Sequence, residues 1–318
     1  MKRIAIALLL IAPLAAAGPF PTRDLNPLLG GFGLPSALPA RVDGESWRVA
    51  TDLNWASTAL IQRADGELLV VDAETREARV TIGRSWSGGF AAQLELPYRY
   101  TGGGVLDEAI HSWHDFFNLP EGARSSMPTD RVRIVYQRAG ATLIDIDSSV
   151  SGLGDASLDF GYSLRSTRAT AVAAWLSVKA PTGDADRLTG SGATDVSLAI
   201  AGEHALSDNW SVFGQAGVTR LGDGERLSAQ QRDVVWSGFA GVGWRAWRGL
   251  QLKAQVDAHS AVFKDTDLDF LGEAVVLTVG GDYRFESGWR FDVAVSEDIA
   301  VESASDVVFV FGLRREWE

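Results

Sequence analysis

The chain has 318 residues, and its 29 Lys and Arg against 41 Asp and Glu give a net charge of −12 at pH 7. This acidic balance argues against a nucleic-acid partner, because binding to phosphates requires clustered Lys and Arg. The sequence has no Cys, which excludes disulfide bonds and thiol chemistry among these residues.

The first 17 residues have the three regions of a secretory signal peptide. Lys2 and Arg3 precede an apolar run over 4–11, and Ala15-Ala16-Ala17 is a small-residue cleavage site. The apolar run is too short for a membrane-spanning helix. We therefore expect residues 1–17 to be removed on export, and residues 18–46 to form a periplasmic N-terminal segment.

From residue 47 onward, apolar side chains recur at every second position between clusters of Gly, Asp, Ser and Asn. A period of two indicates β-strands. In the clearest run, polar Gln251, Lys253, Gln255, Asp257 and His259 alternate with apolar Leu250, Leu252, Ala254, Val256 and Ala258. Strands of a soluble sandwich average about five or six residues, whereas a tilted transmembrane strand needs about nine to eleven, which these runs reach. We therefore expect residues 47–318 to form an all-β protein, a transmembrane antiparallel β-barrel.

The connections between these runs alternate in length. Tight links fall at 87–89, 166–167, 207–209, 248–249 and 286–288, and most of the others are long. Outer-membrane barrels have short periplasmic turns, longer extracellular loops and an even number of strands. On this basis we expect about 12 strands, with residues 131–149 adding either a hairpin in the longest loop or two further spanning strands, a range of about 12–14.

Aromatic residues support the same topology. Six Trp fall at the expected periplasmic ends of strands: Trp47, Trp86, Trp210, Trp247, Trp289 and Trp317. Indole rings favour the membrane interface, where an apolar body meets a polar edge, so we expect an aromatic girdle against outer-membrane lipid.

The longest loop also carries a helical pattern. Leu106, Ile110, Trp113 and Phe117 recur at helical spacing. We expect a short amphipathic helix there, in the extracellular loop, either folded into the barrel mouth or lying on its rim.

Charged side chains of both signs occupy positions that face inward under this alternation. The expected lumen-lining residues are Arg48, Asp52, Glu95, Arg99, Asp159, Lys179, Asp195, Glu203, Lys253, Asp257, Asp282, Arg284, Arg290 and Asp292. Such groups line a narrow aqueous channel or pair into a network that fills the lumen. We favour a porin-like passive channel for small solutes, with a surface or structural barrel whose lumen is filled as the alternative. The acidic excess suggests a mild preference for cations.

A membrane-embedded lipid hydrolase is a less favoured alternative. His259 and Ser260 are adjacent in a strand and point to opposite faces, whereas a nucleophile and its base must come within hydrogen-bond reach. Asp265, Asp267 and Asp269 lack the complete spacing of a Ca²⁺-binding loop. We therefore expect no enzyme, no catalytic residue, no metal site and no cofactor.

Six segments carry a resemblance to a known family: RDLNPLL at 23–29, WHDFFNLPEGAR at 113–124, KAPTGDADRLTGSGATDV at 179–196, DAHSA at 257–261, DTDLDFLG at 265–272 and SDVVFVFGLRR at 305–315. Over nearly all of the mature chain, the sequence resembles an uncharacterised family of proteobacterial outer-membrane proteins, known only as a domain of unknown function. The resemblance implies a β-barrel in the outer membrane of a Gram-negative bacterium. It brings no activity, substrate or catalytic residue.

The last run, residues 307–317, resembles the C-terminal signature by which the barrel-insertion machinery recognises outer-membrane proteins. We expect that machinery to insert the chain, as a monomer, into outer-membrane lipid.

Overall fold

The computed structural model describes residues 18–106, 112, 128–299 and 303–318. The expected signal peptide and the expected loop helix around Trp113 lie outside the described residues.

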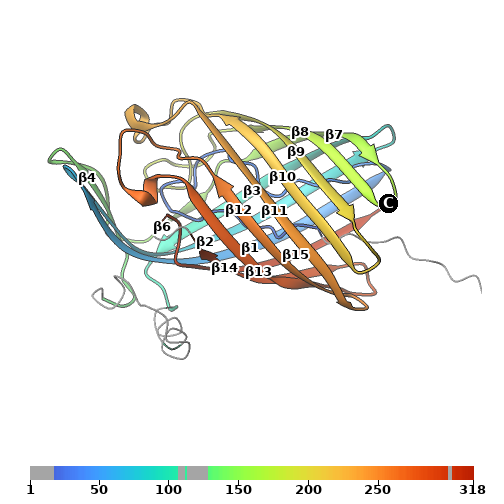
Figure 1. The fold of residues 1–318 in the computed structure, drawn as a ribbon. Coiled ribbons are helices and arrows are strands. Elements are labelled where there is room, and N and C mark those ends of the chain that lie inside the picture. Colours follow the sequence, from blue (N-terminus) through green and yellow to red (C-terminus); the bar gives the residue numbers. More distant parts are fainter. Residues whose placement is uncertain (1–17, 107–111, 113–127, 300–302) are drawn as a thin grey trace, which may run out of the picture.

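Twelve antiparallel strands, each paired with its neighbours, close a barrel (Figure 1). They are β1 (Ser46–Ala64), β2 (Glu67–Trp86), β3 (Phe90–Gly102), β7 (Ser157–Ser166), β8 (Thr170–Lys179), β9 (Asp195–Ala205), β10 (Trp210–Arg220), β11 (Val234–Trp247), β12 (Leu250–His259), β13 (Ala274–Arg284), β14 (Arg290–Asp298) and β15 (Val307–Trp317). The last strand closes the barrel on the first, in a register that runs from Trp47 opposite Trp317 to Ser57 opposite Val307. The predicted fold class is confirmed.

Three further strands lie at the end opposite the C-terminus. β4 (Arg133–Arg138) pairs with the start of β2, and β5 (Ala141–Ile146) pairs with β4, so that a hairpin projects past the barrel rim (Figure 1). β6 (Val150–Leu153) pairs with the end of β3. Residues 131–149 therefore add a hairpin to the longest loop and no spanning strands.

The two ends of the barrel differ as the sequence predicts. Tight turns at 87–89, 167–169, 206–209, 248–249 and 285–289 share one end with the C-terminus, whereas the connections at the other end, apart from residues 65–66, are longer. Short turns face the periplasm in outer-membrane barrels, so we call the first the periplasmic end and the second the extracellular end.

Side chains on each strand alternate between lipid and lumen. On β2, Val80 and Ile82 are 40% and 44% exposed on the outside, whereas Arg79 and Thr81 are buried within the barrel. Large apolar side chains that stay exposed after folding are the expected covering of a surface that faces lipid. The Trp residues lie at the periplasmic end: Trp47, Trp86, Trp210, Trp247 and Trp317 are exposed on strand ends, and Trp289 directly precedes β14. This placement is the one that an interfacial girdle requires.

A hydrophobic cluster closes the extracellular end. It combines Leu60, Leu69 and Val71 of β1 and β2 with the β4–β5 hairpin and with side chains from the loops after β8, β10 and β12. Two 3₁₀-helices, η2 (Ser228–Gln230) and η3 (Asp269–Leu271), lie in these loops. Among the described residues, no helix is long and apolar enough to cross a membrane.

The N-terminal segment lies inside the barrel, whereas we expected residues 18–46 to lie in the periplasm. Residues 18–45, here called the inner segment, begin near Arg290 and Arg314 at the periplasmic end and reach the extracellular cluster with Leu28, Leu29 and Phe32. They return to the periplasmic turn at Thr167, whose carbonyl accepts a hydrogen bond from Arg41. The segment holds five prolines and no strand period, so its sequence does not mark its partners.

Candidate functional site

The lumen is the candidate site, and the inner segment fills much of it. Proline removes backbone donors and prevents ladder pairing, so inward side chains of the wall satisfy this backbone instead. The Phe20 N–H donates to Gln255 Oε1 at 2.9 Å, and the Leu38 N–H donates to Gln215 Oε1 at 2.9 Å. Gln215 Nε2 donates in turn to the Ser36 carbonyl at 3.0 Å. The segment is thus held by polar, non-covalent contacts.

One buried charge cluster sits on β12 to β15. Lys253 Nζ lies 2.6 Å from Asp292 Oδ1 and 3.2 Å from Asp282 Oδ2. Arg314 contacts Asp292 at 3.2 Å, and Arg290 contacts Asp282 at 3.4 Å. Each carboxylate is shared between two cations, as the high cost of burying an unpaired charge requires.

A second cluster ties the ends of β8 and β9 to the connection between β6 and β7 and to the inner segment. Lys179 Nζ lies 2.8 Å from Asp155 Oδ2 and 3.0 Å from Asp195 Oδ2. It also donates to the carbonyl of Gly31 in the inner segment at 2.7 Å. This lysine therefore joins three parts of the chain at the extracellular half of the lumen.

A third cluster lies on β2 and β3. Glu77 pairs with Arg99 and lies 3.8 Å from Arg23 of the inner segment, and Arg79 lies 3.5 Å from Glu95. Burial lowers the pKa of the Arg23 guanidinium from its ordinary value, and the Glu77 carboxylate opposes that shift. The pairing therefore offsets part of the cost of taking Arg23 out of water.

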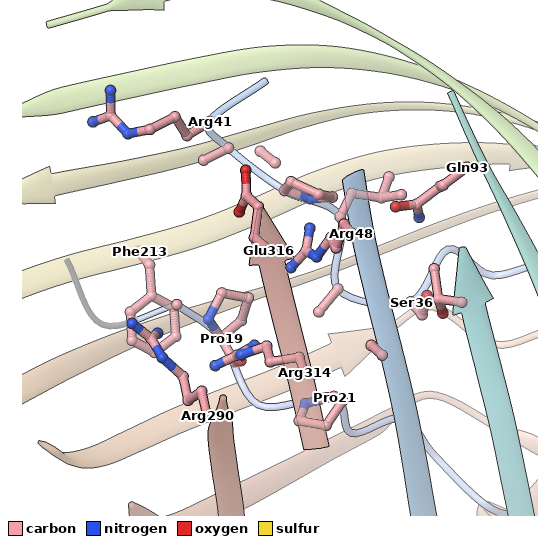
Figure 2. Close-up of a pocket in the computed structure, with 18 of the residues that line it drawn as sticks. Pro19, Pro21, Ser36, Arg41, Arg48, Gln93, Phe213, Arg290, Arg314 and Glu316 are labelled. Carbon is pink, nitrogen blue, oxygen red and sulfur yellow. The ribbon is translucent and has the colours of Figure 1, made fainter. Parts of the chain in front are cut away.

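A cavity of about 440 Å³ remains at the periplasmic end, between the inner segment and the wall. Its lining holds Arg41, Arg48, Arg284, Arg290 and Arg314 together with backbone and prolines of the inner segment. Figure 2 shows Arg290 and Arg314 beside Pro19, with Arg48 close by. The space is lined by charged groups and lies within the lumen, so it is suited to hydrated polar solutes rather than to lipid.

The sequence of this chain matches a family described as proteins of unknown function (DUF3187), over residues 4–317. The chain belongs to the DUF3187 family. No curated protein matches it.

Among solved structures, this DUF3187 barrel is similar to the COG4313 outer membrane channel from Pseudomonas putida F1, with a TM-score of 0.59 and 16% identity over 88% of this chain and 97% of that one. It is less similar to the NanC porin, with a TM-score of 0.47 and 9% identity over 86% and 99% of the two chains, and to the KdgM porin, at 0.45 and 9% over 85% and 99%. The first likeness shows a shared fold. With its apolar outer face and polar lumen, the DUF3187 chain is an outer-membrane β-barrel.

Most of the lumen-lining residues expected from the DUF3187 sequence are paired. Ten of the fourteen form ion pairs: Asp52, Glu95, Arg99, Lys179, Asp195, Glu203, Lys253, Asp282, Arg290 and Asp292. Asp159 and Asp257 accept hydrogen bonds from Gln93 and Gln255. Arg48 and Arg284 line the cavity, and neither side chain forms a hydrogen bond or ion pair within the described part of the chain.

Several functional residues were missed at the sequence level. Glu77, Arg79 and Arg314 occupy the inward face two residues from other inward positions, so strand alternation could have found them. Asp155 lies between β6 and β7 and Arg23 in the inner segment, where no period marks a partner.

The geometry around His259 does not assemble a hydrolase site. One ring nitrogen contacts Asp24 and the other contacts the Ser260 carbonyl, while Ser260 Oγ accepts a hydrogen bond from the Trp236 N–H. In the described ranges, no group of three or more His, Cys, Asp or Glu could hold a metal ion.

Proposed function

We propose that this barrel is a passive channel for small hydrophilic solutes. In this proposal the inner segment closes the channel and moves aside when the channel opens. The observation that carries the proposal is the cavity of about 440 Å³, which lies inside a transmembrane barrel and is lined by charged side chains. The likeness to a barrel described as an outer membrane channel supports the same function.

Conduction requires the inner segment to move. Leu28, Leu29 and Phe32 belong to the hydrophobic cluster that closes the extracellular end. The cavity is therefore blocked on its extracellular side while these residues stay in place. The contacts that hold the segment are hydrogen bonds, ion pairs and apolar packing, with no covalent link, and such contacts open on the timescales of channel gating.

A structural barrel with a filled lumen is the second candidate. It is favoured by the pairing of ten lumen charges, because a network of paired charges stiffens a barrel without leaving a path. The two functions differ in whether removal of the inner segment creates a pore.

The test compares the mature chain with a variant that lacks residues 18–41 in planar bilayers. A channel should give stepwise currents with brief openings in the mature chain and a larger, steadier conductance in the variant. Heat-dependent mobility on SDS gels verifies that both barrels are folded. A folded variant without current would favour the structural barrel and overturn the channel.

We also propose that the protein is a monomer, that the barrel-insertion machinery inserts it into the membrane, and that it is not an enzyme. Pairing of β15 with β1 closes the sheet within one chain, which supports a monomer. The final strand fits recognition by the barrel-insertion machinery, and the hydrogen bonding of His259 supports a role without catalysis.

A further inference from the structure

The arginines at the periplasmic end form a row across three neighbouring strands. Arg284 of β13 is the register partner of Arg290 of β14, and Arg290 is the register partner of Arg314 of β15. The guanidinium groups of Arg290 and Arg314 converge, because a Cβ placed on Gly18 would lie 3.7 Å from Arg314 Nη2 and 3.8 Å from Arg290 Nη1. Like charges directly opposite one another destabilise a sheet, so this row needs compensation.

Two acidic residues next to this row compensate only part of its positive charge. Asp282 and Asp292 are register partners one step deeper in the lumen, and they contact Arg290 and Arg314. Both carboxylates also pair with Lys253. Two negative charges are therefore shared among Lys253, Arg290 and Arg314, and Arg284 adds a fourth positive charge.

The other acids around the cavity are engaged as well. Seven Arg and four acidic residues line it. Arg79 lies 3.9 Å from Asp52 and 3.5 Å from Glu95, and Glu203 lies 3.3 Å from Arg41. Glu316 accepts a hydrogen bond from Ser46 and is the register partner of Arg48. The space therefore carries an excess of positive charge although the whole chain is acidic.

We propose that this cavity binds a small solute anion that bears a carboxylate or phosphate group, held by Arg290, Arg314 and Arg48. The planar fork of a guanidinium matches both groups, and several forks around one cavity of this size recognise a compact anion rather than a polymer. The inference rests on the proposed function in that it names the class of solute for the channel, and it reverses the cation preference suggested by net charge.

The binding test uses the purified, folded chain in detergent at low salt, titrated calorimetrically with inorganic phosphate and, separately, with citrate. Detergent excludes phospholipid headgroups as the source of the anion. Saturable binding of at least one probe is expected, and Arg48→Gln should weaken it by about tenfold, the loss typical of one charge-assisted hydrogen bond. Arg48 lies opposite Glu316 on β15 but forms no hydrogen bond or ion pair with any described residue, so this variant breaks no ion pair of the fold.

Arg226→Gln is the matched control, because it makes the same change of charge in an extracellular loop, where Arg226 pairs with the exposed Asp186. It should bind both probes as the native chain does. No binding by the native chain, or equal weakening by Arg48→Gln and Arg226→Gln, would overturn the anion site.

Reversal potentials in a KCl gradient separate this inference from the channel itself. Currents that favour chloride, shifted towards potassium by Arg48→Glu and left unchanged by Arg226→Glu, support both. Binding without current rejects the channel and keeps the anion site, whereas potassium-selective current without binding keeps the channel and rejects the site.

Discussion

Asp24 of the inner segment and His259 of β12 are joined inside the barrel, with Asp24 Oδ2 3.0 Å from His259 Nε2. His259 Nδ1 lies 2.9 Å from the Ser260 carbonyl oxygen. Both partners are acceptors, so the two hydrogen bonds form together only when both ring nitrogens carry protons. The inner segment is thus tied to the wall through the Asp24 carboxylate, between its start at Gly18 and the extracellular cluster at Leu28.

Asp24→Ala should loosen the inner segment without unfolding the barrel. A hydrogen bond between charged groups contributes roughly 1.5–3 kcal/mol, so amide hydrogen exchange over residues 20–38 should accelerate by about tenfold or more. Asp43→Ala is the control, since Asp43 is exposed and lies 3.7 Å from Arg41, also exposed. Unchanged exchange in Asp24→Ala would mean that this contact does not hold the segment.

Gly31→Ala should push the inner segment away from the loop after β8. A Cβ on Gly31 would lie 2.4 Å from the Gly190 carbonyl carbon, and backbone cannot move aside as a flexible side chain can. Overpacking of this kind costs about 1–3 kcal/mol, to be measured by denaturant unfolding in lipid vesicles. Gly202→Ala is the comparison, because its Cβ would meet nothing closer than 3.9 Å and should leave stability nearly unchanged.

Val80→Arg should be much more damaging than Thr81→Arg. Val80 is 40% exposed on the outer face of β2, well inside the membrane from Trp86, where an Arg costs roughly 2–4 kcal/mol. Thr81 is its immediate neighbour but lines the cavity, opposite Glu95. Folding yield and unfolding free energy in vesicles measure both, and equal damage would contradict the assigned faces.

Lys253→Met should destabilise the barrel strongly. The Lys253 side chain is fully buried between Asp282 and Asp292, and removal of one member of a buried ionic network costs about 3–5 kcal/mol. Adding Asp292→Asn should recover part of the loss, because it removes the carboxylate closest to the lysine. Arg226→Gln, which breaks an exposed pair, should cost less than about 1 kcal/mol. A loss from Lys253→Met no greater than this would show that the network contributes little.

By itself, the sequence determined the barrel, a strand number of about 12–14, the alternation of short and long connections, and the alternation of outward-facing and inward-facing side chains. These properties depend on local sequence. Val80 and Thr81 lie on opposite faces because successive residues of any strand do, and Ser87-Gly88-Gly89 indicates the tight turn before β3.

Only the tertiary structure decided what fills the barrel. Phe20 meets Gln255 and Asp24 meets His259 across 235 residues, and a segment without a period carries no local signal of such partners. The sign of the cavity charge was hidden for the same reason, because a net charge of −12 does not say where in the fold each charge lies. Pairing across the lumen depends on barrel closure and register, and these leave Arg48 and Arg284 on the cavity wall without a hydrogen bond or ion pair to another described residue.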